Sequence, residues 1–184
     1  PKLPVIVMPP RSRKGARIAI KCLKEGAVDF ITKPEQSNHF TFSRSHFAKR
    51  AIPFLKMIPS IKMESMVSPV LPGRTEDASF FDVSPLSGYK HSEIVVIGGC
   101  TGGVRSLYKV ITSLPASLPV PVIIAQHMPG KYSEELSEDL NRHSALKVQQ
   151  AKHNGELLPG HVYVAPGGYH TIIKNGGNRR TISL

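Results

Sequence analysis

The 184-residue sequence lacks several features that mark whole classes of protein. No run of apolar residues approaches the roughly 20 that a helix needs to cross a bilayer, so we expect no membrane insertion. The two cysteines, Cys22 and Cys100, stand in unlike contexts, which argues against a disulfide framework and favours a reducing, cytoplasmic setting. The eight histidines show no metal-ligand spacing, and no GxGxxG or GKT/GKS nucleotide loop occurs. We therefore expect neither a metal nor a cofactor.

Acidic residues are scarce relative to basic ones. The 13 Asp and Glu stand against 24 Lys and Arg, which gives a net charge of +11. Such an excess fits nucleic acid, an anionic membrane or an acidic protein as partner, and by itself it selects none of them. Basic residues cluster within 11–24, but no aromatic stacking platform accompanies them, so we do not expect nucleic-acid binding.

The first 34 residues have the pattern of a strand–helix–strand unit. Residues 4–8 and 28–31 are short apolar runs, and between them apolar residues recur at helical spacing from Gly15 until Gly26 supplies a stop. A unit of this length predicts two parallel strands joined by a right-handed crossover.

The middle of the chain has the composition of a linker. Residues 35–91 are rich in Ser, Pro and basic residues, and we interpret them as partly disordered. Within them only residues 45–55 have helical potential, and we expect Pro53 to cut that helix short.

Residues 92–184 alternate short apolar runs with amphipathic segments. The expected elements are strands at 94–97, 120–125, 146–151 and 162–165, helices after Gly103 and from Ser133, and a hairpin of 169–173 with 180–184 around Asn175-Gly176-Gly177-Asn178. The inner faces of the two helices are expected to be Leu107, Val110, Ile111 and Leu114, and Leu136 and Leu140. The pattern predicts an α/β fold with an open, mostly parallel sheet, flanking helices and an antiparallel hairpin.

Two reactive side chains follow two of the expected strands. Cys100 lies in the glycine-rich turn after 94–97, and His127 comes directly after 120–126. Because the carboxyl ends of parallel strands meet at one edge of a sheet, a nucleophile and its general base would meet there. Each residue alone also fits a structural role, with Cys100 as a small buried apolar side chain. His170, after a Pro-Gly-Gly-Tyr segment, is a candidate for the same cleft.

Four motifs follow one another in this half of the chain. They are Ile97-Gly98-Gly99-Cys100-Thr101-Gly102-Gly103, Gln126-His127-Met128-Pro129, Leu140-Asn141-Arg142 and Val162-Tyr163-Val164-Ala165-Pro166-Gly167-Gly168-Tyr169-His170. Together they resemble the catalytic domain of CheB-type chemotaxis methylesterases. The resemblance covers essentially all of 92–184. It implies a protein-glutamate methylesterase, which hydrolyses methyl esters of receptor glutamates and often deamidates receptor glutamines, with chemotaxis receptors as partners.

The resemblance assigns roles to individual residues. Cys100 occupies the position of the family's serine nucleophile and His127 that of its general base. The resemblance also implies site-lining or oxyanion positions, which are Gly99, Thr101, Gly102, Met128 and His170. The family's third triad member is an aspartate that lies beyond the hairpin, and no aspartate of this sequence stands at a matching place. We therefore expect a truncated catalytic domain with impaired activity.

Residues 1–34 independently resemble the end of a response-regulator receiver domain. This likeness is carried by Gly26-Ala27-Val28-Asp29-Phe30-Ile31 and Thr32-Lys33-Pro34. Lys33 matches the lysine of the receiver's lysine–proline pair. The phospho-accepting aspartate would lie before Pro1, so a chemotaxis histidine kinase is expected as a partner only where an intact receiver precedes this segment. The expected order is a receiver remnant (1–34), a linker (35–91) and a catalytic domain (92–184). A catalytically silent module that binds chemoreceptors or other chemotaxis proteins is the alternative.

Overall fold

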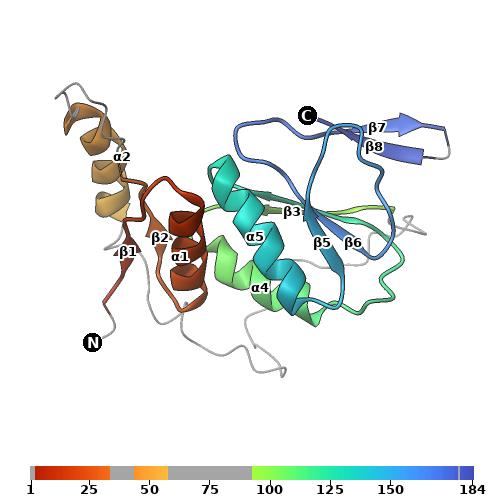
Figure 1. Ribbon diagram of the computed structural model, residues 1–184, viewed down its shortest axis with the longest axis horizontal. Coiled ribbons are helices and arrows are strands. Elements are labelled where there is room, and N and C mark those ends of the chain that lie inside the picture. Colours follow the sequence, from red (N-terminus) through yellow and green to blue (C-terminus); the bar gives the residue numbers. More distant parts are fainter. Residues whose placement is uncertain (1–2, 34–43, 58–92, 178) are drawn as a thin grey trace, which may run out of the picture.

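The structure, a computed structural model, describes residues 3–33, 44–57, 93–177 and 179–184. Its larger part is a parallel sheet with two helices on one face, and its smaller part is an amino-terminal unit packed beside those helices (Figure 1). Most of the expected linker, 34–43 and 58–92, lies outside the described residues. No helix within the described ranges is long and apolar enough to cross a membrane.

The amino-terminal unit, residues 3–33, has the predicted strand–helix–strand order. Strands β1 (Ile6–Val7) and β2 (Asp29–Phe30) pair in parallel, and α1 (Arg13–Lys24) connects them. The helix begins earlier than Gly15 because the Ser12 hydroxyl accepts a hydrogen bond from the Gly15 N–H at 3.0 Å and caps it. It ends before Gly26, whose φ of +110° breaks the helical path.

Helix α2 (Arg44–Met57) corrects one expectation. The predicted helix at 45–55 forms, but it continues through Pro53 for four more residues. Proline removes one helical N–H donor, and the exposed position of Pro53 allows the helix to accept that loss without burying an unpaired carbonyl. Pro53 therefore does not end this helix.

The main sheet confirms the predicted α/β class. Its strands run in parallel in the order β3-β4-β6-β5, with bounds β3 (Val95–Gly99), β4 (Val122–Gln126), β5 (Lys147–Gln150) and β6 (His161–Val164). Helices α4 (Gly103–Ser113) and α5 (Gly130–His143) cover one face (Figure 1). The core between them is apolar and includes Leu107, Ile111, Leu136, Leu140, Val122, Ile124, Val148, Val162 and Val164. Burial of these side chains fixes the sheet and helices as one layered unit.

Two details of the helices differ from the sequence expectation. Val110 was expected on the inner face of α4, but it is 45% exposed, and the buried positions are Val104, Leu107 and Ile111. Helix α5 begins at Gly130, not at Ser133. Ser133 lies buried in the first turn, where its hydroxyl donates to the Gly130 carbonyl at 2.8 Å. Its role is therefore to join segments inside the fold, since it also accepts from Gly167 N–H.

The predicted hairpin is present. Strands β7 (Ile172–Gly176) and β8 (Arg179–Ser183) pair antiparallel and form a separate two-stranded sheet. Ile182 of β8 packs with Ile123 and Tyr163 in a second core cluster on the sheet face opposite α4 and α5. The hairpin is thereby attached to the main sheet through side chains.

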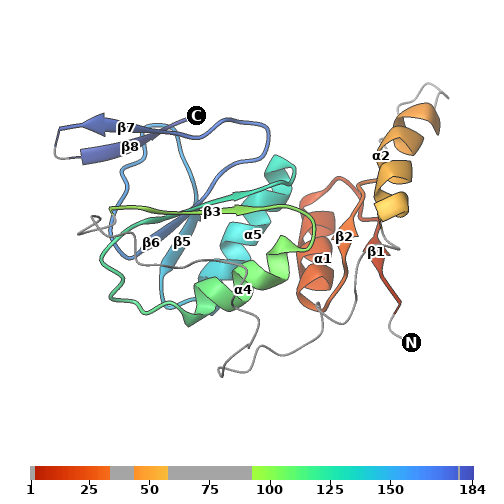
Figure 2. The ribbon, with the colours of Figure 1, turned by 180° about the vertical axis from the view of Figure 1, so that it is seen from behind.

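The amino-terminal unit lies against α4 and α5, on the side where α1 faces them (Figure 2). Phe30 stacks on Tyr132 of α5 with ring centroids 4.3 Å apart. Three ion pairs join α1 to α5, and they are Arg13 with Glu138, Arg17 with Glu135 and Lys24 with Asp139. The contact thus combines apolar packing with a row of opposite charges.

Candidate active site

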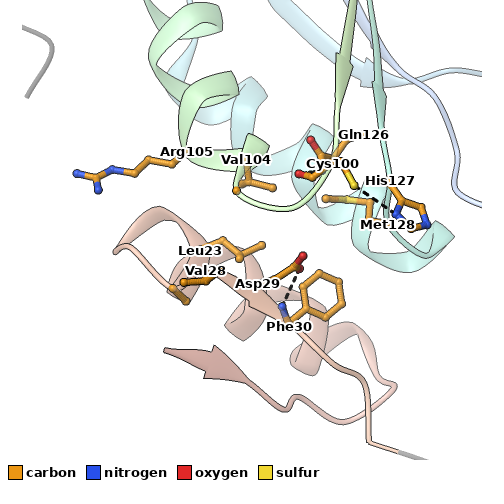
Figure 3. Close-up of a pocket in the computed structure, with 12 residues that line it drawn as sticks. Leu23, Val28, Asp29, Phe30, Cys100, Val104, Arg105, Gln126, His127 and Met128 are labelled. Atoms are coloured by element: carbon orange, nitrogen blue, oxygen red, sulfur yellow. Dashed lines mark hydrogen bonds between the residues drawn. The ribbon is translucent and has the colours of Figure 1, made fainter. Parts of the chain in front are cut away.

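The strand register places Cys100 and His127 side by side. Gly99 and Gln126 are register partners at the carboxyl ends of β3 and β4, so the next residue of each strand leaves the sheet at the same edge. The His127 N–H donates to the Gly99 carbonyl at 2.9 Å, which extends the pairing by one step. The Cys100 Sγ lies 3.8 Å from His127 Nδ1 (Figure 3). This arrangement has the geometry of a thiol and a proton acceptor.

The glycine-rich turn sets the direction of the chain after Cys100. Gly102 has a φ of +79°, a left-handed conformation that a side chain would disfavour. The Gly103 N–H then donates to the Cys100 carbonyl at 2.9 Å, and α4 begins there. Cys100 consequently lies just before a helix amino terminus, where backbone N–H groups lack helical acceptors.

The amino-terminal unit shares this edge with the turn. One hollow is lined by Cys100, His127 and Met128 together with Asp29 and Phe30 of the amino-terminal unit. Figure 3 shows Asp29 and Phe30 directly across from the Cys100 turn. The Cys100 side chain is exposed, and β2 borders it on one side.

The other residues singled out from the sequence fall into two groups. Gly99, Thr101 and Gly102 form the turn around Cys100, and Met128 is buried and lines the hollow. His170 is exposed and does not line that hollow, so its predicted role in the cleft stays a prediction. Lys33 has an exposed side chain.

The described residues provide neither a carboxylate partner for His127 nor a metal-binding cluster. In the parts of the chain that the structure covers, no carboxylate contacts His127, and the ring presents Nδ1 to the sulfur. The same ranges hold no group of three or more Cys, His, Asp or Glu side chains placed to bind a metal. A nucleophile and a base are therefore present without an orienting acid in the described structure.

Two residues of the site were not singled out from the sequence. Gln126 precedes His127, and its side chain packs against the glycine turn, with Nε2 donating to the Cys100 carbonyl at 2.8 Å. Asp29 accepts a hydrogen bond from the Thr101 hydroxyl. A signal for Gln126 existed in its position as the last residue of a strand beside a glycine turn, whereas no local pattern connects Asp29 to Thr101.

A charged cluster fastens the amino-terminal unit to α4 and α5. Asp139 of α5 accepts hydrogen bonds from Lys24 Nζ at 2.8 Å, from Arg142 at 2.6 Å and from the Tyr108 hydroxyl. Burial alone would raise the pKa of Asp139, but these three donors outweigh it and lower that pKa to about 2. Burial, and then the bond to Asp139, raise the pKa of Tyr108. The cluster joins α1, α4 and α5 through one ionised carboxylate.

Comparison with known proteins identifies relatives. Residues 95–183 match the CheB methylesterase family. The chain is 37% identical over 171 residues to a protein-glutamate methylesterase/protein-glutamine glutaminase of Clostridium acetobutylicum, covering 93% of this chain and 47% of that protein. It is 34% identical over 184 residues to the protein of that name in Halalkalibacterium halodurans, covering 99% of this chain and 50% of that protein.

A solved structure is also similar to part of the chain. The crystal structure of the Thermotoga maritima CheB methylesterase catalytic domain is 39% identical and has a TM-score of 0.49, and the match covers 51% of this chain and 50% of that one. The chain spans about half the length of the curated relatives it matches. The family match and these relatives agree with the motifs around Cys100 and His127, and residues 95–183 are therefore similar to a CheB methylesterase domain.

Proposed function

We propose that this chain carries the nucleophile and base of a chemotaxis protein-glutamate methylesterase. Cys100 is the nucleophile and His127 is the base, and the substrate is a glutamate methyl ester, or a glutamine side-chain amide, of a methyl-accepting chemotaxis receptor. The observation that supports this most is the 3.8 Å separation of Cys100 Sγ and His127 Nδ1 at the carboxyl edge of the sheet. The names of the relatives support the substrate class.

The reaction has two steps. His127 accepts the Cys100 proton while sulfur forms a bond to the ester carbonyl carbon, and the methoxy group leaves as methanol after taking that proton. The resulting thioester on Cys100 is then hydrolysed by water, which regenerates the thiol and leaves the glutamate carboxylate. With glutamine as substrate, ammonia leaves in place of methanol.

We expect turnover by this chain to be slow. A triad acid fixes the tautomer of the histidine, and losing the correct tautomer costs about 10⁴ in serine proteases. In the described structure His127 has no such partner. The lack of an orienting partner is expected to slow thioester formation as well as its hydrolysis, because both steps need a correctly oriented base.

The test is capture of the intermediate. A receptor peptide with a glutamate methyl ester is incubated with the chain, and mass spectrometry locates any adduct. An adduct on Cys100 that hydroxylamine removes, and that is absent in Cys100→Ala and strongly reduced in His127→Gln, supports the proposal. Methanol release without any dependence on Cys100 contradicts it.

The alternative is a silent interaction module. One observation favours it, because Asp29 bonds to Thr101 and the amino-terminal unit lines the hollow beside Cys100. Under this alternative the chain binds the receptor peptide, but neither thioester nor methanol forms at any peptide concentration. Isothermal titration together with the adduct assay distinguishes the two.

A further inference from the structure

Gln126 occupies an unusual position at the end of β4. The residue is only 7% exposed, and its side chain packs against the turn that holds Cys100. Nε2 donates to the Cys100 carbonyl at 2.8 Å, so the amide orientation is fixed, because Oε1 in that place would face another acceptor. The same carbonyl also accepts from the Gly103 N–H. Two donors therefore hold one carbonyl oxygen in place.

Two glycines of the turn, Gly99 and Gly103, leave the space that the Gln126 amide occupies. A Cβ on Gly99 would lie 2.2 Å from Gln126 Oε1, and a Cβ on Gly103 would lie 2.8 Å from it. Both distances are too short for any real side chain, so the turn leaves this space for the amide. Oε1 itself is buried and has no hydrogen-bond partner among the described residues. Burying an unpaired oxygen costs free energy, and a residue kept there for packing alone would be better served by an apolar side chain.

The position of the Cys100 carbonyl determines where the next N–H points. In a trans peptide the carbonyl and the following N–H point in opposite directions. Since the Cys100 carbonyl points toward Gln126, the Thr101 N–H points away from Gln126. Among the described residues this N–H has no backbone hydrogen-bond acceptor. It is thus a free donor in the same peptide as the nucleophile.

We propose that Gln126 is a positioning residue, which holds the Cys100–Thr101 peptide so that the Thr101 N–H can stabilise the oxyanion formed when Cys100 attacks a carbonyl carbon. This rests on the proposed function of Cys100. Gln126 itself touches neither substrate nor the reacting atoms. Its effect is confined to reactions that develop charge on a carbonyl oxygen.

The experiment compares two reactions of the same thiol. All variants carry Cys22→Ser, so that Cys100 is the single cysteine. Acylation by p-nitrophenyl acetate forms an oxyanion, whereas alkylation by iodoacetamide is a displacement at carbon that forms none. In Gln126→Met we expect acylation to fall by about 10-fold, less than the roughly 100-fold that losing the Thr101 N–H itself would cost, because the Gly103 N–H still holds the Cys100 carbonyl, and we expect alkylation to change by less than about threefold.

Two further variants test whether the effect is specific to the Gln126 amide. Gly103→Ala leaves the amide in the sequence but pushes on Oε1, and it should lower acylation in the same direction by a smaller factor. Gln150→Met is the matched control, because Gln150 also ends a strand and its Nε2 donates to the Gly130 carbonyl, away from Cys100. It should leave the ratio of acylation to alkylation unchanged. Circular dichroism establishes that each variant is folded.

The outcomes separate the two proposals. If the parent chain is acylated no faster than its His127→Gln variant, the nucleophile–base pair fails, and the role of Gln126 fails with it. If the parent shows His127-dependent acylation but Gln126→Met loses acylation and alkylation equally, or loses neither, the positioning role alone is overturned. A selective loss of acylation supports it.

Discussion

The Thr101 hydroxyl donates a hydrogen bond of 2.6 Å to Asp29 Oδ2, although the two residues are 72 positions apart in the sequence. Asp29 belongs to the amino-terminal unit, and Thr101 follows Cys100 in the glycine turn. A second oxygen of the same carboxylate accepts the Phe30 N–H at 2.8 Å, which orients the Asp29 side chain toward the turn. One carboxylate therefore connects the amino-terminal unit to the turn next to the Cys100 thiol.

Asp29→Ala should weaken the contact between the amino-terminal unit and the turn. Cys100 is already exposed, so we expect the loss of this bond to lower the free energy of unfolding, by about 1 kcal/mol, and not to uncover the thiol. Urea denaturation measures the change. Glu25→Ala, which removes an exposed carboxylate at the end of α1, is the control and should leave the free energy of unfolding unchanged. An unchanged stability in Asp29→Ala would show that the bond does not hold the unit in place.

The ion pairs between α1 and α5 should contribute very unequally to stability. Glu135 has a side chain that is 2% exposed, and it is 3.2 Å from Arg17 Nε. Arg17→Met removes the nearer guanidinium from that buried carboxylate and leaves Arg142 at 3.6 Å, and we expect a loss of roughly 1–3 kcal/mol in the free energy of unfolding. Urea denaturation measures it.

Arg13→Met is the matched comparison for that change. Arg13 also pairs across α1 and α5, but the side chains of Arg13 and Glu138 are 66% and 34% exposed. Solvent and salt screen such a pair, so its loss should cost under about 1 kcal/mol. Equal losses in the two variants would rule out burial of Glu135 as the source of the difference.

Asp139→Asn should destabilise the protein in a pH-dependent way. The folded pKa of Asp139 is about 2, against an ordinary value of 3.8, so ionisation of this group stabilises the fold above about pH 4 and that contribution is lost as the pH falls toward 2. The shift corresponds to about 2 kcal/mol at neutral pH. Unfolding free energies of the parent and the variant should differ at pH 7 and converge near pH 2. Glu134→Gln, an exposed carboxylate on α5, should show no such convergence.

Local sequence patterns were sufficient for the sheet and for the central pair. Alternation of apolar runs with amphipathic segments predicted parallel strands, and parallel strands bring residues that follow them to one edge, so the proximity of Cys100 and His127 followed from topology. Burial on a helix depends on the neighbours that pack against it. Periodicity alone therefore placed Val110 inside α4, although no element covers it in the described structure.

The remaining features depend on contacts between distant segments. The Asp29–Thr101 bond and the stacking of Phe30 on Tyr132 join parts of the chain that are far apart in the sequence, and a composition or periodicity pattern does not specify such docking. Ser133 has the residue type of a helix cap, but three segments converge on its buried hydroxyl. Its role became visible only with the tertiary structure.

Cys100→Ser should lose acylation activity, even though the resemblance to the methylesterase family implies a serine nucleophile at this position. The sulfur already lies 3.8 Å from His127 Nδ1, and a C–O bond is shorter than a C–S bond, so the serine oxygen would lie no closer to the base without movement of the turn. A hydroxyl also holds its proton far more tightly than a thiol, and it depends more on a base that a carboxylate orients. We expect p-nitrophenyl acetate acylation to fall at least about 100-fold in Cys100→Ser, with Cys22→Ser as the control that retains the parent rate. A serine variant as fast as the parent would mean that a group outside the described residues orients His127 and that the thiol is not required for attack.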